Sequence, residues 1–573
     1  MASPSTVVVQ LLTHTEDPFF QEVVGKTSWT PGVDEFRGIP YADVAGRWKH
    51  STLRRELPSD SFDASKNGPR CPQPQAPNNS DTFHSYLAFP DVTEDELTCL
   101  NLFIIRPNEE SLGRLGLRMG FEKLPAYVYI HGGGYGFGAA TDPMWDPTRL
   151  VASSIALGRP FITVGINYRL NIFGFAASPL LMHAQKDIAG IKGCNFGLVD
   201  QRNALEWVST NISAFGGDPN QITLGGQSAG ASSVHAHVIE ATAVQGYPLF
   251  SRAIMESGAM GTLGPSSMAS AQANFDSLTK ALDLTGLDDD EMLARLRAVP
   301  ASKIVDTGIA LGWWVFPLTL DGHTIRTSTT RRWEVSLGNE GVEPVQRPSR
   351  KQMVVMAGDC DTEASIWDAQ VLRLRDFAEI QALLRTSLSE SAIAKFHLAY
   401  PMDATLSLAS LRRQITQFLS DYAFGHPVHL ARGELGNRSS LHHTTSVQSF
   451  NVRYRNPFQE PEQAVSHHCV ELIYVFDAFH EALQQVDAKA GSSEHADLVR
   501  ATQKHWIEFI TRAGEQDIAD DQTVVWNLHG KTIVKTLTDQ DMILRTRRFK
   551  MLENMGAEAG VLFSVLTSIE VDK

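Results

Sequence analysis

The sequence predicts an α/β protein with one large, mostly parallel sheet and helices on both faces of that sheet. Short runs rich in β-branched and aromatic residues alternate with segments of helical spacing. This alternation is typical of a parallel sheet whose strands are joined by helical crossovers. Of the 573 residues, 43% are hydrophobic and 20% are charged, a composition that suits a large buried core and argues against disorder.

The individual elements follow from local patterns. A helix is expected over 200–212 because Ala204, Val208 and Ile212 recur every four positions. Residues 113–123, rich in basic and glycine residues, are expected to form a surface loop between the first two strands. The strands are expected at 102–105, 126–130, 161–166, 222–224 and 252–255.

Nothing in the sequence divides the chain, because it contains no internal repeat, low-complexity linker or Pro/Ser-rich hinge. The sequence therefore predicts one domain over residues 1–573. The range from about 269 to 385 holds more helical pattern, and it is expected to form a helical cap that covers the sheet and lines the site. The apolar stretch 560–569 is too short to span a bilayer and is expected to pack as a terminal helix.

Charge and composition exclude several kinds of partner. The net charge of −15 argues against binding to nucleic acid or to an anionic membrane surface. The first twenty residues lack the basic and apolar regions of a secretory signal, so we expect a cytoplasmic location. Histidines one or two positions apart, such as His235 and His237, do not share a helix face, so we expect neither a metal nor another cofactor. Nothing in the sequence indicates an oligomeric state.

The most informative segment is GGQSAG at 225–230. It follows the expected strand at 222–224 and precedes small residues that can open a helix. A strand, G-x-S-x-G and a helix in this order form the setting of a nucleophile elbow, in which a sharp turn lifts the serine hydroxyl to the carboxyl edge of the sheet. The alternative is an ordinary exposed serine in a glycine-containing loop.

A second glycine motif, HGGGYG at 131–136, follows the strand that ends at Ile130. Consecutive glycines expose backbone N–H groups that can stabilise a developing negative charge. A flexible glycine loop is the alternative. Because the motif precedes an elbow in the chain, the two together predict acyl transfer with Ser228 as the nucleophile.

These motifs and many surrounding residues resemble the type-B carboxylesterase family, which also contains the cholinesterases and some fungal lipases. The resemblance runs over nearly the whole chain and implies an α/β-hydrolase fold and serine ester hydrolysis. The segments that carry it include FRGIPYA (36–42), HGGGYGFG (131–138), NFGLVDQRNALEWVSTNISAFGGDPNQITLGGQSAGASS (195–233) and LFSRAIMESG (249–258).

The resemblance also locates the acid of a catalytic triad. In GDCDTEASIW (358–367), the family's G-x-x-x-x-E pattern places this acid at Glu363. Asp359 and Asp361 are the competing carboxylates. The order nucleophile, acid, histidine along the chain is the order expected for this fold.

The histidine of the triad is expected in SHHCVELIYVF (466–476). The family has a histidine three positions before a glutamate and eight before a phenylalanine, which selects His468 and leaves His467 as the rival. His468 would take the Ser228 proton, and Glu363 would orient the imidazole. Cys469 stands where the family often has glycine.

Matching positions in the family place the oxyanion donors at the N–H groups of Gly133, Gly134 and Ala229. Six residues are expected to contact the substrate. The alternative for the aromatic ones is that they pack in the core, as most aromatic side chains do. The residues expected to do so are Tyr135, Phe137, Gln227, Trp313, Trp314 and Phe316.

Cys71 and Cys99 are the one cysteine pair that the resemblance connects. They could form a disulfide or remain as two free thiols. Cys99 stands two positions before Asn101 instead of the family's four. A shift of two residues keeps a strand side chain on the same face, so a bridge remains possible. In a reducing cytosol both would be thiols, and we expect no bridge there.

Three functions are consistent with these residues. The first is hydrolysis of an ester or lactone of a neutral, fairly apolar small molecule. The second uses the same site as an acyltransferase or as a lactonising or dehydrating enzyme of a biosynthetic pathway. The third is a non-catalytic, cholinesterase-like interaction protein, although such proteins lose the nucleophile or the histidine and this chain has both.

Overall fold

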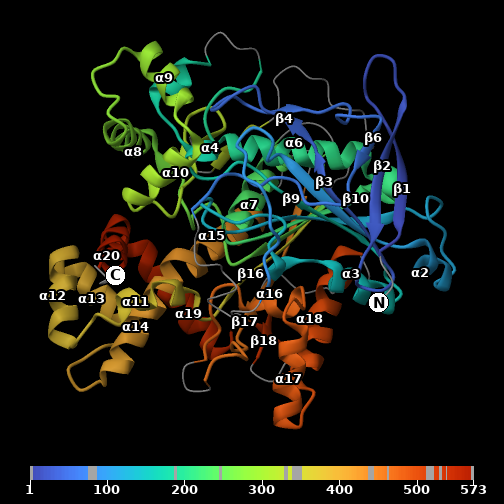
Figure 1. Ribbon diagram of the computed structural model, residues 1–573. Coiled ribbons are helices and arrows are strands. Elements are labelled where there is room, and N and C mark those ends of the chain that lie inside the picture. The colour runs from blue at the N-terminus through green and yellow to red at the C-terminus, as the bar shows by residue number, and fades with distance from the viewer. Residues whose placement is uncertain are drawn as a thin grey trace.

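A sheet of 13 strands runs through the middle of the molecule in this computed structural model (Figure 1). Its strands follow the order β1-β2-β3-β7-β9-β8-β10-β11-β16-β17-β18-β19, and β6 (Ser61–Asp63) pairs with β2. The structure describes residues 4–74, 87–185, 190–243, 248–327, 333–337, 352–436, 444–460, 464–511, 522–527, 532–536 and 538–569.

Seven neighbouring strands at the centre run parallel. The strands at both edges pair antiparallel, except that β6 pairs parallel with β2. The mostly parallel sheet predicted from the sequence is therefore confirmed. The parallel strands are β9 (Ile162–Ile166), β8 (Leu124–Ile130), β10 (Gly217–Gln227), β11 (Arg252–Glu256), β16 (Gln352–Cys360), β17 (Thr444–Val452) and β18 (Gln522–Trp526). The edge strands are β1 (Thr6–Leu12), β2 (Phe20–Thr27), β3 (Val33–Pro40), β7 (Asn101–Pro107) and β19 (Thr532–Thr536).

Helices cover both faces of the sheet, as the alternating side chains of β8 show. Ala126, Val128 and Ile130 belong to one core cluster, which includes residues of α6 (Phe196–Asn211) and α7 (Ala229–Ala243). Tyr127 and Tyr129 belong to a second cluster, which includes residues of α18 (Glu494–Ile510). Because successive strand residues point to opposite faces, the two clusters lie on the two sides of the sheet.

The range 269–385, expected as one helical cap, contains the central strand β16. The helices of this range and of the residues that follow it form two separate groups at the left of Figure 1. The upper group is α8 (Met268–Ala281), α9 (Asp289–Ala298) and α10 (Ala301–Ala310). The lower group includes α12 (Phe377–Ser387), α13 (Glu390–Ala399) and α14 (Leu408–Ser420) and packs against α19 (Gln540–Met555) and α20 (Ala557–Thr567).

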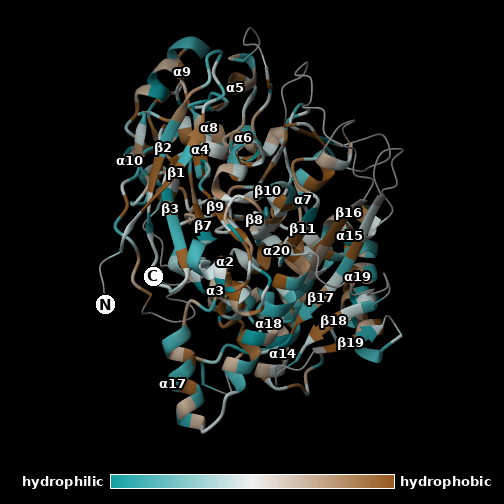
Figure 2. Cartoon of the chain, turned by 90° about the vertical axis from the view of Figure 1, so that its right-hand side faces the viewer, coloured by the Kyte–Doolittle hydropathy of each residue, from teal (hydrophilic) through white to brown (hydrophobic). Residues whose placement is uncertain are grey.

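The terminal helix expected over 560–569 is confirmed as α20. Its buried residues, Ala559, Leu562 and Leu566, join the core cluster of the lower helical group. By contrast, α9 lies at the outside of the molecule and is largely hydrophilic (Figure 2). Within the described ranges, no helix combines the length and the apolar character needed to cross a membrane.

All five cysteines are buried, unbridged thiols. Cys71 and Cys99 nevertheless lie close together. A hydrogen bond with the Cys71 thiol is the largest cause of the raised pKa of Cys99, and burial is the next largest. The structure therefore brings this pair together without a disulfide.

Candidate active site

Ser228 occupies the sharp turn between β10 and α7. Its φ angle is +58°, a left-handed conformation that costs free energy for any residue other than glycine. Its backbone N–H donates a 2.8 Å hydrogen bond to the carbonyl oxygen of Glu256 at the end of the neighbouring strand β11. The strand, turn and helix predicted around this serine are confirmed, and the elbow is anchored to the adjacent strand.

The glycines on either side of Ser228 let β10 and α7 approach closely. A Cβ atom on Gly230 would lie 2.0 Å from the carbonyl oxygen of Ile130, and one on Gly226 would lie 2.6 Å from the carbonyl carbon of Gly230. Neither contact is sterically possible. The G-x-S-x-G spacing is therefore required by backbone packing at the elbow.

His468 and Glu363 form a buried pair next to the elbow. Nδ1 of His468 lies 2.6 Å from Oε2 of Glu363, and the other carboxylate oxygen accepts a 2.6 Å hydrogen bond from the backbone N–H of Cys360. Glu363 is only 1% exposed. Because the carboxylate accepts from Nδ1–H, this arrangement leaves Nε2 as the nitrogen that can accept a proton.

The competing residues have other partners. Asp359 accepts a 3.0 Å hydrogen bond from Asn451 and forms an ion pair with Arg545. Asp361 is exposed, and its carboxylate lies 3.9 Å from Arg453.

The rival histidine, His467, is also engaged elsewhere. Its Nδ1 lies 2.7 Å from the carbonyl oxygen of His468, and its Nε2 lies 2.9 Å from Asn456. Burial lowers its pKa to about 4. Of these five acids and histidines, only Glu363 and His468 face each other.

Gln227 contacts His468. Its side-chain nitrogen lies 3.2 Å from Nε2 of His468, and the residue is buried. The sequence predicted a substrate contact for Gln227, whereas the structure places its amide against the imidazole. Its position directly before the nucleophile was the only indication in the sequence, and chain adjacency does not reveal a partner 241 residues away.

The glycine loop after β8 lies against the elbow. A Cβ atom on Gly132 would be 3.2 Å from Cβ of Ser228. Gly133 and Gly134 have φ angles of +103° and +60°, so both positions favour glycine. The helix α7 begins at Ala229, whose N–H has no partner within the helix because it belongs to the first turn. The loop and the helix N-terminus can thus supply N–H donors beside Ser228.

An apolar wall, defined here as Trp313, Trp314, Val315 and Phe316, borders this loop. The backbone N–H of Phe316 donates a 2.9 Å hydrogen bond to the carbonyl oxygen of Gly134. Trp314 and Val315 are 41% and 49% exposed. The rings of Trp313 and Phe316 meet edge to face with centroids 6.3 Å apart. The wall therefore presents apolar surface next to the expected oxyanion donors.

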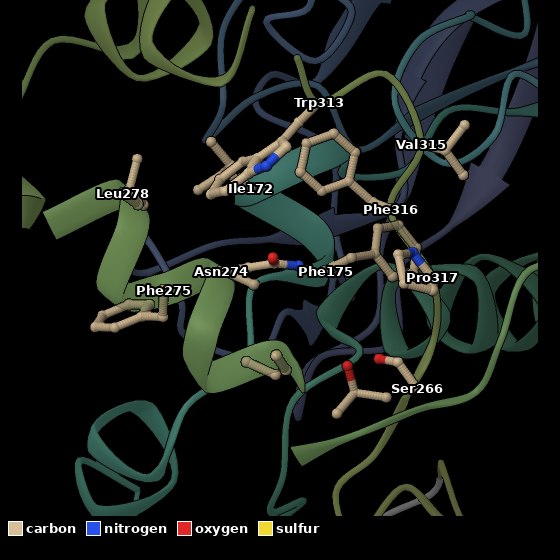
Figure 3. A pocket seen from close by; sticks show the side chains of 14 residues that line it. Ile172, Phe175, Ser266, Asn274, Phe275, Leu278, Trp313, Val315, Phe316 and Pro317 are labelled. Carbon is tan, nitrogen blue, oxygen red and sulfur yellow. The ribbon is translucent and has the colours of Figure 1, made fainter. Parts of the chain in front are cut away.

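A cavity of about 60 Å³ lies behind this wall (Figure 3). Phe175, Phe275 and Leu278 line its far side, and none of its lining residues is charged. Asn274 and Ser266 supply its polar atoms together with Thr319.

The two aromatic residues predicted beside the glycine loop differ. Phe137 is partly exposed, whereas Tyr135 is fully buried, with its hydroxyl 3.1 Å from the Ser233 hydroxyl and its ring against Phe175. Tyr135 therefore packs in the core, and we do not retain it as a substrate contact. Among the residues that the structure describes, no three or more His, Cys, Asp or Glu side chains gather as metal ligands would.

Comparison with known proteins identifies the family and supports the fold described above. A family model described as "Carboxylesterase family" matches residues 22–548. Lipase 3 of Yarrowia lipolytica is 27% identical over 489 residues, which cover 85% of this chain and 86% of the lipase. A solved structure named PNB esterase has a TM-score of 0.66 and 26% identity, and the match covers 93% of this chain and 99% of that chain.

A further relative bears on whether the site is active. The "Inactive carboxylesterase-like protein VdtD" of Byssochlamys spectabilis is 34% identical over 311 residues. This match covers 51% of the present chain and 49% of that protein. Other fungal relatives are named as secreted lipases.

Proposed function

Because the chain belongs to the carboxylesterase family and is a serine hydrolase of carboxylic esters, we propose that Ser228, His468 and Glu363 are its catalytic triad. The 2.6 Å contact between Nδ1 of His468 and Glu363 is the observation that carries this assignment. The strained elbow at Ser228 supports it.

The proposed reaction begins when His468 Nε2 removes the proton of Ser228 and the serine oxygen attacks the ester carbonyl. Glu363 stabilises the imidazolium that results. The N–H groups of Gly133, Gly134 and Ala229 stabilise the negative charge on the attacked carbonyl oxygen. His468 then gives its proton to the leaving alcohol, and an acyl group remains on Ser228.

A water molecule completes the cycle. His468 removes a proton from this water, the hydroxide attacks the acyl carbon, and the carboxylic acid leaves as the proton returns to Ser228. No further group is required for either half of this reaction.

We propose that the substrate is a neutral, fairly apolar ester or lactone. The exposed side chains of the wall are Trp314 and Val315, and the residues around the cavity behind the wall are uncharged. A charged substrate would lose hydration at such a surface without gaining an ionic partner. Phe137, Trp313, Trp314 and Phe316 remain proposed substrate contacts.

A cytoplasmic location also remains a proposal. Relatives named as secreted lipases favour the alternative, an extracellular location. Detection of the tagged chain in cell and culture fractions decides between the two. A nucleic acid partner is not expected at a net charge of −15.

The name of one relative, an inactive carboxylesterase-like protein, favours the non-catalytic alternative. Labelling with a fluorophosphonate probe separates the two functions, because only an activated serine reacts rapidly. We expect the label on the peptide that contains Ser228, together with turnover of p-nitrophenyl esters. Ser277, an exposed serine of α8, is the matched control, and Ser277→Ala should label normally. An unlabelled native chain would refute the proposed function.

A further inference from the structure

Two buried carboxyl groups lie behind the proposed triad. Glu256 ends β11, and its backbone carbonyl accepts the N–H of Ser228. Glu471 belongs to α16 (Val470–Val475) and follows His468 by three residues. Both residues are at most 1% exposed. One carboxyl group is thus tied to the nucleophile and the other to the histidine segment.

Each carboxyl group has one bonded and one free oxygen. Oε1 of Glu256 accepts a 3.1 Å hydrogen bond from the indole N–H of Trp506, and Oε2 of Glu471 accepts one of 3.0 Å from the thiol of Cys360. Oε2 of Glu256 and Oε1 of Glu471 are buried without a hydrogen-bond partner in the described part of the chain. An unsatisfied buried carboxylate oxygen is costly, so both free oxygens require a proton donor.

The surroundings supply no positive charge to this pair. Within the described residues, neither carboxyl group takes part in an ion pair with lysine, arginine or histidine. The titratable groups that face the pair from the packed elements are Tyr127, Tyr129, Cys360, Glu363, Tyr454 and Cys469. Burial raises the pKa of each of these tyrosines and thiols, so their protons stay in place at neutral pH.

We propose that Glu256 and Glu471 share a single proton between their free oxygens through one water, and that this pair positions His468 against Ser228. The proposal rests on the proposed function, since it concerns the same serine and histidine. One proton satisfies both free oxygens and halves the charge of the pair. It also links β11, which holds the nucleophile, to the segment that carries the histidine.

The electrostatics agree with this geometry. Burial raises the pKa of Glu256. It also raises the pKa of Glu471, and the charges of Glu256 and Glu363 raise it further. Two carboxylates that interact in a buried site cannot both ionise at neutral pH. Loss of the shared proton at alkaline pH leaves two like charges, which repel and separate the histidine segment from β11.

The test measures the proton and its consequence separately. The infrared difference spectrum between the wild-type protein and the Glu256→Gln/Glu471→Gln double variant should show a protonated-carboxyl band at neutral pH that disappears as the pH becomes alkaline, and the difference removes the contribution of Asp142, whose pKa burial raises to about 7. The rate of fluorophosphonate labelling and kcat/KM should fall about tenfold per pH unit through the same titration, as for loss of one essential proton. KM should change little, because the wall is not involved.

Glu256→Gln and Glu471→Gln each replace the shared proton with an amide N–H that does not titrate. Both variants should lose the infrared band, and their kcat/KM should fall less than about twofold over the pH range in which the wild type falls tenfold. Glu291→Gln, at an exposed helix residue that pairs with Arg295, is the control and should keep the wild-type band and pH profile.

Two results would overturn the proposal: no protonated-carboxyl band at neutral pH in the difference spectrum between the wild type and the Glu256→Gln/Glu471→Gln double variant, or an unchanged alkaline fall of kcat/KM in Glu256→Gln. Circular dichroism establishes that each variant folds, and Glu256→Gln alone suffices if Glu471→Gln does not fold. Failure of the proposed function can be distinguished from failure of the shared-proton proposal. If Ser228 is not an activated nucleophile, the chain does not react with the fluorophosphonate at any pH, while the infrared band of the two carboxyl groups persists.

Discussion

Nε2 of His468 lies 3.2 Å from the amide nitrogen of Gln227, the residue that precedes Ser228 in the chain. This ring nitrogen is the one available for the serine proton, because Nδ1 is engaged by Glu363. In this structure the amide therefore occupies the lone pair that the proposed mechanism requires. If the proposed mechanism holds, proton transfer from Ser228 has to displace this contact.

Gln227→Glu should move the acid limb of the kcat/KM profile to higher pH. A carboxylate at this position accepts a hydrogen bond from protonated imidazole and so favours the inactive, protonated histidine. The measurement is kcat/KM for a p-nitrophenyl ester across acidic and neutral pH. Gln221→Glu, on the same strand but without contact to His468, is the control, and equal acid limbs in both variants would contradict the contact.

Ser228→Ala should lower kcat by on the order of 10⁶-fold, because the triad acts as a unit and the alanine has no nucleophilic oxygen. Burst kinetics with a p-nitrophenyl ester should also lose the acyl-enzyme phase. Turnover close to that of the wild type would refute the assignment of the nucleophile.

Glu363→Gln should lower kcat by about 10⁴-fold, since an amide favours the wrong tautomer of His468. Asp361→Asn should leave kcat nearly unchanged, because this carboxylate is exposed and lies 3.9 Å from Arg453. Steady-state kinetics of the two variants at one pH provide the comparison. Equal losses would show that Glu363 does not orient the histidine.

Phe316→Ala should increase the preference for esters with longer acyl chains roughly tenfold. Removal of the ring opens the wall, so that the cavity of about 60 Å³ behind it becomes accessible to a substrate in front of it. Phe275→Ala is the matched control, since it enlarges the far side of the same cavity and leaves the wall closed. Ratios of kcat/KM over a chain-length series separate them. The same shift in both variants would mean that Phe316 is not the barrier.

The free energy of unfolding should decrease as the pH falls from 6.5 toward 4. Burial lowers the pKa of His131, His467 and His505 to about 4, so the unfolded chain binds these protons before the folded chain does. Above pH 6.5 these histidines are neutral in both the folded and the unfolded chain, so they do not lower the free energy of unfolding there. At pH 5 each of these three histidines should lower the free energy of unfolding by about 2 kcal/mol.

His505→Gln offers a direct check of this acid sensitivity. Chemical unfolding at pH 7 and pH 5 should show a loss about 2 kcal/mol smaller than in the wild type. His323→Gln, at an exposed histidine, should show the full loss. A variant at position 505 with undiminished acid sensitivity would contradict the assigned cause.

Structural elements that depend on a few neighbouring residues could be predicted from the sequence. The strand before Ser228, the helix after it and the helix over 196–211 all follow from local spacing. Contacts between distant segments were not predictable in the same way. Tyr135 lies beside the glycine loop in the chain, but its ring points into the core toward Phe175, because adjacent residues of a turn can face opposite directions.

The course of the chain over 269–385 shows a second limit. The sequence indicated only that this range holds more helical pattern, and the structure has the helices α8–α10 and α12 there, with the strand β16 between them. A short, nearly continuous apolar run such as the one at 353–357 is compatible with either a buried strand or a buried helix. Only pairing with β11 and β17 decides between the two.

The hydrogen bond from the Phe316 N–H to the Gly134 carbonyl joins the wall, which is proposed to select the substrate, to the glycine loop, which is proposed to stabilise the transition state. Exchanging a side chain in this segment leaves the main-chain link intact, so substrate preference can diversify by point substitution. An insertion or deletion there would pull on the glycine turn itself and slow every substrate alike. Laboratory evolution of this scaffold should therefore accumulate substitutions, and almost no length changes, at positions 313–316.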